Sequence, residues 1–232
     1  AAVPEESQRL KDSIGISIAE DNREVVANSK FIFLAVPAIF YPNVVREVAD
    51  LASPDHIFVS LTPGYTLQRF HDEFGDAIRV VRIMPNTPAF VAQGMTAVCM
   101  PGLSPEEEAE FHQVLSSFGQ VEVLPERLMD VIVSVTGSSP AYVYMMIEAM
   151  GDAAVSIGLS RDSAYRLAAQ ALIGSATMVR DTGKHPGALK DDVCTPGGTT
   201  IQAVRVLEER GFRSALFEAM LKCHFAGAAP TT

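Results

Sequence analysis

The 232-residue sequence lacks the short patterns that identify many nucleotide-binding and metal-binding proteins. None of its 16 glycines is followed by another glycine two residues later, so a GxGxxG dinucleotide loop is absent. It also contains no HExxH metal motif, no phosphate-binding P-loop and no Ser-His-Asp order. Any catalytic or cofactor site therefore has to be built from residues outside these patterns.

Disulfide patterns, long apolar runs and basic runs are missing as well. The 3 cysteines, Cys99, Cys194 and Cys223, are far apart and have neither disulfide nor metal-site spacing. No stretch approaches the roughly 20 apolar residues of a membrane helix, and the first residues, AAVPEESQRLKD, do not resemble a secretory signal. A net charge of −10 without a basic run disfavours nucleic acid and anionic membranes as partners. We expect a cytoplasmic protein that binds no metal.

Residues 1–124 alternate between strand-like and helix-like segments. An α/β domain with a largely parallel sheet explains this alternation. Between the last two strand candidates, Ser104, Pro105 and Glu107 form the start signal of a helix, with a capping box. The strand candidates are residues 31–36, 56–61, 78–84, 96–100 and 120–124.

Residues 125–232 contain helical patterns and no convincing strand. The segment 140–157 is apolar on nearly every face, which is typical of a helix buried in a core or in an oligomer interface. A second helix is predicted from Ser160 to about Gly183, and a third ends at Gly211. We therefore predict two domains, residues 1–124 and residues 125–232.

Three proline- or glycine-containing loops follow predicted strands: AVPAIF (35–40), LTPGY (61–65) and MPNTPAF (84–90). Ligands of open α/β sheets bind at the carboxyl ends of the strands, so these loops are candidates for a ligand site. Asn86 would then face the ligand. A structural proline turn, in which Asn86 caps its own backbone, explains the third loop equally well.

The densest polar stretch, GKHPGALKDDVCTPGGTT (183–200), precedes a helical pattern. Glycines and hydroxyls before a helix favour an anion site, because the first N–H groups and the helix dipole attract negative charge. A turn with a threonine N-cap is the plain alternative. His185 is an acid–base candidate, although bracing the loop suits it better. Glu148 and Asp152 share a helix face. Their two alternative roles are a carboxylate pair for acid–base chemistry and a hydrogen-bonded structural pair.

Four longer stretches carry a resemblance to a known family: RIMPNTPA, VTGSSPAYVYMMIEAMGDAAVSIGLSR, AAQALIGSATM, and HPGALKDDVCTPGGTTI with the later LEERGFRSAL. They are similar to pyrroline-5-carboxylate reductases over essentially the whole chain. The resemblance implies an enzyme that reduces an imino acid, 1-pyrroline-5-carboxylate, to L-proline with NADP(H) or NAD(H). It also implies a Rossmann-type domain followed by an all-α dimerisation domain, in a homodimer or a ring of dimers.

The resemblance assigns the polar loop to the substrate. In the family, backbone N–H groups and hydroxyls of this loop hold the substrate carboxylate, and one threonine hydroxyl approaches the ring nitrogen. That threonine corresponds to Thr200, the proposed catalytic residue. The other matching positions are Thr195, where the family usually has serine, and Gly197, Gly198 and Thr199.

The resemblance also assigns cofactor contacts. Asn86 and Thr87 of MPNTP, and Val36 and Pro37 of AVP, match contacts to the nicotinamide and its ribose. Asn22 matches an asparagine near the adenosine ribose.

Three departures from the family pattern accompany the resemblance. The chain begins after the family's glycine loop, so we expect an N-terminally incomplete Rossmann-type domain. AVPA replaces AVKP, and GSSP replaces GSGP with Ser139 in place of a glycine. The alternative is that the chain is a non-catalytic or truncated member of the family. Such a member keeps the dimer and the substrate loop but cannot hold the dinucleotide.

Overall fold

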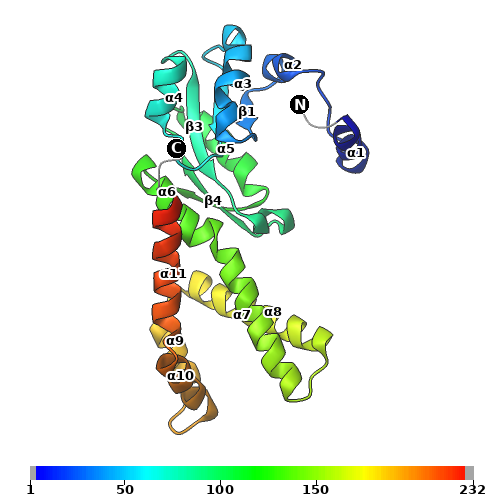
Figure 1. Cartoon of the computed structure of the whole chain (residues 1–232). Helices are drawn as coiled ribbons and strands as arrows, with labels where there is room; N and C mark the ends of the chain where they lie inside the picture. The colour runs from blue at the N-terminus through cyan, green and yellow to red at the C-terminus, as the bar shows by residue number, and fades with distance from the viewer. Residues whose placement is uncertain (1–3, 228–232) are drawn as a thin grey trace. The chain divides into compact units, whose positions relative to one another are not determined.

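The computed structural model describes residues 4–227, which divide into two compact units. The first unit contains the described residues up to Gly137 together with Gly227, and the second extends from Ser138 to Ala226. Figure 1 shows the sheet within the first unit and only helices and loops within the second.

The first unit contains one five-stranded sheet in which the strand order follows the chain, β1-β2-β3-β4-β5. All neighbours are parallel except β3 and β4. The predicted strands and the largely parallel sheet are confirmed, with bounds that shift by one or two residues. The strands are β1 (Phe31–Leu34), β2 (Ile57–Ser60), β3 (Arg79–Met84), β4 (Gly94–Cys99) and β5 (Gly119–Val123).

The antiparallel junction follows from the length of one loop. Only residues 85–93 connect β3 to β4, whereas a parallel crossover needs about a dozen residues or more. The chain therefore reverses direction, and Met84 pairs with Ala97.

Helices and short turns connect the strands. Ser104 accepts a hydrogen bond from the Glu107 N–H, and the Glu107 carboxylate accepts one from the Ser104 N–H, which confirms the predicted capping box of α5. The α-helices of this unit are α1 (Pro4–Ile14), α2 (Asn22–Ala27), α3 (Tyr41–Val48), α4 (Leu67–Phe74), α5 (Pro105–Ser116) and α6 (Met129–Ile132). The 3₁₀ turns are η1 (Ala38–Phe40), η2 (Ala49–Leu51), η3 (Thr87–Val91) and η4 (Glu126–Leu128), and η5 (Val133–Gly137) is a π-helical turn.

The sheet buries an apolar cluster on each face. One cluster contains Phe58 and Val80 of the sheet together with side chains of α2, α3, α4 and α6. The other contains Val59 and Val81 with Phe111 and Leu115 of α5. Because adjacent strand residues point to opposite faces, the apolar runs of these strands supply both clusters.

The second unit consists of five helices: α7 (Ser139–Ser156), α8 (Arg161–Thr182), α9 (Pro186–Val193), α10 (Thr199–Glu209) and α11 (Phe212–Gly227). Gly151 allows α7 and α8 to approach closely, because a Cβ there would lie 2.4 Å from a ring atom of Tyr165. The predicted N-cap of α8 at Ser160 and its end at Gly183 are confirmed.

Few side chains of the second unit are buried within one chain. Tyr144, Met145, Leu167 and Ile173 are all more than half exposed. The sequence predicts that the apolar helix is buried either in a core or in an oligomer interface. A core within the chain is wrong for much of α7, and an oligomer interface is the alternative that remains.

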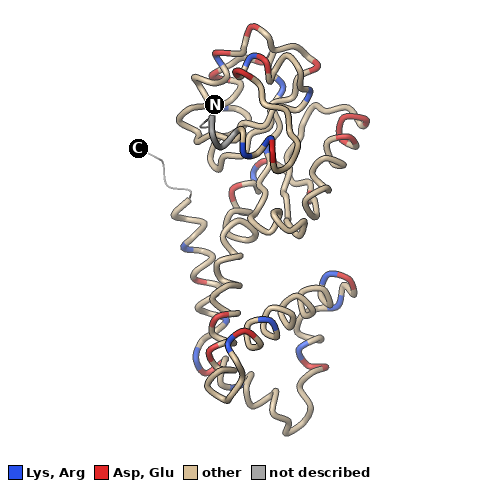
Figure 2. Tube along the Cα trace, turned by 90° about the vertical axis from the view of Figure 1, so that its right-hand side faces the viewer, with Lys and Arg blue, Asp and Glu red and all other residues tan. Residues whose placement is uncertain are grey.

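Charged side chains of both signs are interspersed along the chain (Figure 2). Many form local ion pairs, such as Arg23 with Asp50 and Arg205 with Glu209. Among residues 4–227, no helix is both long and apolar enough to cross a membrane.

Candidate active site

Three loops of the first unit leave the same edge of the sheet. The parallel strands β1, β2 and β3 end at Leu34, Ser60 and Met84. Their carboxyl ends therefore bring together the loops that contain Val36 and Pro37, residues 61–65, and Asn86 with Thr87. This is the edge at which open α/β sheets bind ligands.

Asn22 and Val36 line one cavity of about 100 Å³, between α2, α3 and the first two strands. The Asn22 amide lies at the start of α2 and donates a hydrogen bond of 2.9 Å to Glu47. Two of the residues predicted to bind the cofactor are thus neighbours, although 14 positions separate them in sequence. Pro37 comes next and caps η1.

Asn86 makes two hydrogen bonds beyond its own turn. Its Oδ1 accepts from the Met95 N–H at 2.9 Å, and its Nδ2 donates to the Thr136 carbonyl at 3.0 Å. The plain alternative, in which Asn86 caps its own backbone, is wrong, because no side-chain bond caps η3. The amide instead joins the η3 loop to β4 and to the π-helical turn, an irregularity that is frequent at functional sites.

Two buried polar residues at this edge belong to no short sequence motif. Tyr41 lies within α3, and its hydroxyl contacts the ends of β1 and β2. Arg82 interrupts the apolar run of β3. Their signal in the sequence is a polar side chain at a position that the strand or helix pattern assigns to the core.

Arg82 is 2% exposed and binds two carboxylates. Its guanidinium lies 3.0 Å from Glu126 and 3.0 Å from Asp130. The same carboxylates accept the backbone N–H groups of Leu67 and Gly64, at 2.6 and 3.2 Å. Arg82 thereby connects β3, the loop after β2 and residues 126–130 in one network.

In the second unit, the predicted substrate residues form a turn at the start of α10. The Gly198 N–H donates to the Thr195 carbonyl at 3.0 Å. Pro196 and the positive φ of Gly197, 69°, fit the second and third positions of a type II turn. A Cβ on Gly198 would lie 2.4 Å from the Thr195 hydroxyl, so only glycine fits there without displacing it.

Gly198 is the N-cap of α10, and no side chain caps the helix. The predicted alternative of a threonine N-cap is therefore wrong. The first N–H groups of an uncapped helix are free to bind an anion. Within residues 4–227, no hydrogen bond involves the hydroxyl of half-buried Thr200, so it is available to a ligand.

Two of the other acid–base candidates, His185 and Asp152, have structural partners. His185 Nδ1 accepts the Gly187 N–H at 3.0 Å and caps α9, which confirms its predicted bracing role. Asp152 pairs with Arg161 and forms no pair with Glu148. A hydrogen bond from Lys190 to Asp191 raises the pKa of the Lys190 ammonium. No cluster of possible metal ligands occurs among residues 4–227.

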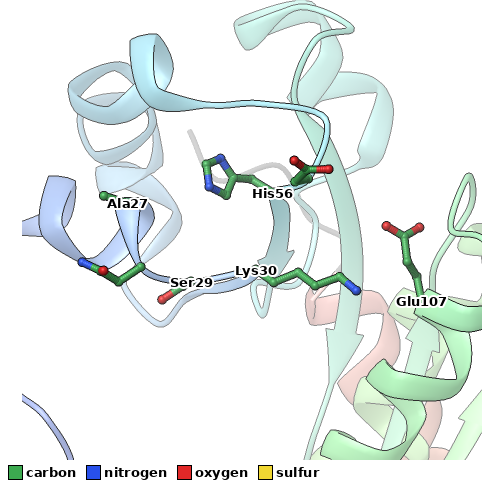
Figure 3. A pocket seen from close by; sticks show the side chains of 7 residues that line it. Ala27, Ser29, Lys30, His56 and Glu107 are labelled. Carbon is green, nitrogen blue, oxygen red and sulfur yellow. The ribbon is translucent and has the colours of Figure 1, made fainter.

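A cavity of about 470 Å³ lies at the other edge of the sheet (Figure 3). Lys30 and His56 directly precede β1 and β2, so this cavity is at the amino ends of the strands. His56 Nδ1 accepts the Ser53 N–H at 3.1 Å. The location argues against a dinucleotide site, because such ligands bind at the carboxyl ends.

Two family models match the chain. The model for pyrroline-5-carboxylate reductase dimerisation matches residues 126–227. The model for NADP oxidoreductase, coenzyme F420-dependent, matches residues 2–64.

Curated relatives match most of the sequence. A pyrroline-5-carboxylate reductase of Escherichia coli is 48% identical over 221 residues, which cover 95% of this chain and 82% of the relative. The enzyme of that name from Pisum sativum is 39% identical over 211 residues, 90% of this chain and 77% of the relative.

Solved structures also match most of the chain. A pyrroline-5-carboxylate reductase from Coxiella burnetii has a TM-score of 0.88 and 29% identity, and covers 97% of this chain and 85% of its own. A pyrroline carboxylate reductase from Plasmodium falciparum with NADP bound has a TM-score of 0.83 and 25% identity, with 93% of this chain and 82% of its own covered.

Proposed function

Because the chain belongs to the pyrroline-5-carboxylate reductase family, we propose that it reduces 1-pyrroline-5-carboxylate to L-proline with NADPH or NADH. The observation that carries the proposal is the 195–200 turn. It presents uncapped helix N–H groups and the Thr200 hydroxyl, which suit a substrate with a carboxylate and a ring nitrogen.

The substrate carboxylate would bind the turn formed by Thr195, Gly197, Gly198 and Thr199. The glycines allow close approach of the carboxylate to the backbone, and the positive end of the helix dipole favours its charge. The Thr200 hydroxyl would then hydrogen-bond the ring nitrogen. Positioning of this kind supplies much of the acceleration of a hydride transfer, and no strong general base is needed.

The dinucleotide, when bound, supplies the hydride. We propose that it binds at the carboxyl edge of the sheet, where Asn22 and Val36 line one cavity. We propose that Pro37, Asn86 and Thr87 hold its nicotinamide half. Asn86 would contribute mainly by fixing the η3 loop, since its amide already binds Met95 and Thr136.

We also propose that the two predicted domains have different roles. Residues 1–124 would bind the dinucleotide, and residues 125–232 would bind the substrate and form a homodimer or a ring of dimers, as the dimerisation model over 126–227 supports. A cytoplasmic location suits the three free thiols, Cys99, Cys194 and Cys223. Fractionation of cells that express the chain tests the location.

Turnover of 1-pyrroline-5-carboxylate by the purified chain, followed as NADPH or NADH oxidation, tests the activity. Thr200→Ala should lower kcat by about 10- to 100-fold, because a hydrogen bond to the reacting nitrogen is lost. NADPH affinity should stay near that of the unmodified chain, since the proposed dinucleotide contacts lie in the other unit.

Thr200→Ser is the matched control for this substitution. It keeps the hydroxyl and should retain most of the activity. An equal loss of turnover and of NADPH binding in Thr200→Ala, or no difference between the alanine and serine variants, would contradict the role of Thr200.

A further inference from the structure

Tyr41 carries a hydroxyl that joins the carboxyl ends of two strands. The side chain is fully buried, at 0% exposure. Its hydroxyl donates to the Leu34 carbonyl at 3.0 Å, and it accepts from the Leu61 N–H at 3.2 Å and the Thr62 hydroxyl at 2.9 Å. These three bonds use the one proton and both lone pairs of a phenol oxygen, and the Ser60 hydroxyl lies at 3.4 Å.

The position of this hydroxyl in the sheet is defined by the strand register. Where the parallel pairing of β1 with β2 begins, the Ile57 N–H donates to the Lys30 carbonyl at 2.8 Å. A parallel ladder repeats this bond at every second residue. Two repeats further on, the Leu61 N–H would donate directly to the Leu34 carbonyl.

The Tyr41 hydroxyl binds both of those atoms. It therefore stands in place of the last ladder bond, and it inserts one oxygen atom between β1 and β2 at their carboxyl ends. The loop with Val36 and Pro37 follows on one side, and the 61–65 loop follows on the other. Separating two strands at this edge widens the space in which α/β sheets receive ligands.

We propose that Tyr41 is a positioning residue for the dinucleotide: by replacing the last ladder bond, its hydroxyl fixes the spacing between the 35–37 loop and the 61–65 loop. The inference rests on the proposed function, which gives the 35–37 loop its role in cofactor binding. Tyr41 itself needs no contact with the dinucleotide.

Tyr41→Phe isolates the hydroxyl. The ring packs in the core, 4.9 Å from the ring of Tyr65, and a phenylalanine ring can keep that place. The ring still separates the strands, so the Leu61 N–H loses its acceptor and cannot reach Leu34. A buried N–H without a partner is costly, and the 61–65 loop should become more mobile.

The experiment measures two quantities in the full chain. The first is amide hydrogen exchange at Leu61, which should be faster in Tyr41→Phe. The second is the Kd for NADPH, from nicotinamide fluorescence, which should rise about tenfold, the factor expected for the loss of about one hydrogen bond. The value of kcat at saturating NADPH should change little, because the substrate turn is in the other unit.

Phe111→Leu is the control for a general loss of stability. Phe111 packs in the cluster on the opposite face of the sheet from Tyr41, with its ring 4.9 Å from that of Phe31 at the amino end of β1. This variant should unfold more easily while Leu61 exchange and the Kd for NADPH remain near those of the unmodified chain. An unchanged Kd in Tyr41→Phe, or an equal rise in Phe111→Leu, overturns the inference.

The measurement on the unmodified chain separates the inference from the proposed function. If that chain neither binds NADPH nor reduces 1-pyrroline-5-carboxylate, the proposed function fails. Leu61 exchange still decides the structural part, because faster exchange in Tyr41→Phe supports the inserted bond and unchanged exchange overturns it.

Discussion

Thr96 lies in β4 with a fully buried hydroxyl that has no hydrogen-bond partner in the described part of the chain. Removing the hydroxyl while keeping the shape should relieve this cost. We expect Thr96→Val to raise the free energy of unfolding by about 1 kcal/mol, as measured by urea denaturation. A lower stability would show that the hydroxyl has a partner, such as a bound water.

Single residues also show what the sequence could reveal about the site. The bracing role of His185 was predictable because its partner, the Gly187 N–H, lies two positions away. The contacts of Asn86 were not, because its partners lie 9 and 50 positions away. A motif identifies such a residue as important, but only the fold shows what it binds.

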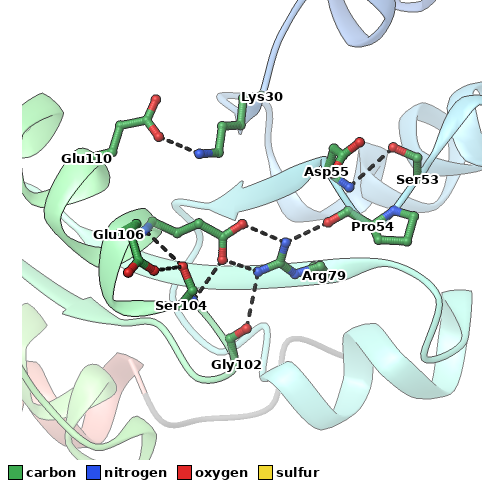
Figure 4. A network of polar contacts seen from close by, with 10 residues as sticks. Lys30, Ser53, Pro54, Asp55, Arg79, Gly102, Ser104, Glu106 and Glu110 are labelled. Atoms are coloured by element: carbon green, nitrogen blue, oxygen red, sulfur yellow. Dashed lines mark hydrogen bonds and ion pairs between the residues drawn. The ribbon is translucent and has the colours of Figure 1, made fainter.

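The start of α5 shows how one element depends on charge. Glu107 binds Arg79 through both carboxylate oxygens, at 2.9 and 2.6 Å, and accepts the Ser104 N–H. Arg79 also donates to the carbonyls of Pro54 and Gly102 (Figure 4). The Arg79 hydrogen bond, followed by the bond from Ser104, lowers the pKa of Glu107 from 4.5 to about 2.

A lowered pKa in the folded state stabilises the protein above the unfolded pKa, and this contribution is lost as the pH falls. At pH 7, the free energy of unfolding should be about 2 kcal/mol higher for the unmodified chain than for Glu107→Gln. The difference should shrink between pH 4.5 and pH 2, the two values of the pKa. Urea denaturation of both proteins across this range tests it, and a difference independent of pH would contradict it.

The strands and helices were largely predictable, whereas some of their pairings were not. Apolar runs and the Ser104 capping box are local signals, so bounds came within one or two residues. The antiparallel step from β3 to β4 depends on the short 85–93 connection. The bond inserted by Tyr41 depends on the register of two strands, which no local pattern contains.

At the scale of the whole molecule, the second unit leaves apolar side chains without cover. Met145 on α7 is 68% exposed, and Tyr144, Leu167 and Ile173 are also exposed. Exposed apolar groups of this extent are typical of an interface. We predict that these helices bury them against a second copy of the chain.

Met145→Glu should therefore shift the protein from dimer, or a larger assembly, toward monomer. A charge placed in an apolar interface has to be desolvated without a partner, which weakens association by about tenfold or more. Sedimentation velocity over a range of concentrations measures the shift. Gln113→Glu on α5 adds the same charge to the first unit and should leave the assembly unchanged. An unaltered assembly in Met145→Glu would place the interface elsewhere.

The order of the strands has a consequence for the growing chain on the ribosome. Each strand after β1 pairs with the strand synthesised just before it. The sheet can therefore grow as each strand leaves the ribosome, without waiting for distant segments of the chain. Arg82 depends on later segments, because its partners Glu126 and Asp130 follow 44 and 48 positions later. Until they emerge, a buried cation in the nascent sheet has no counter-charge. The first unit should therefore reach its full stability only after residues 126–130 have left the ribosome.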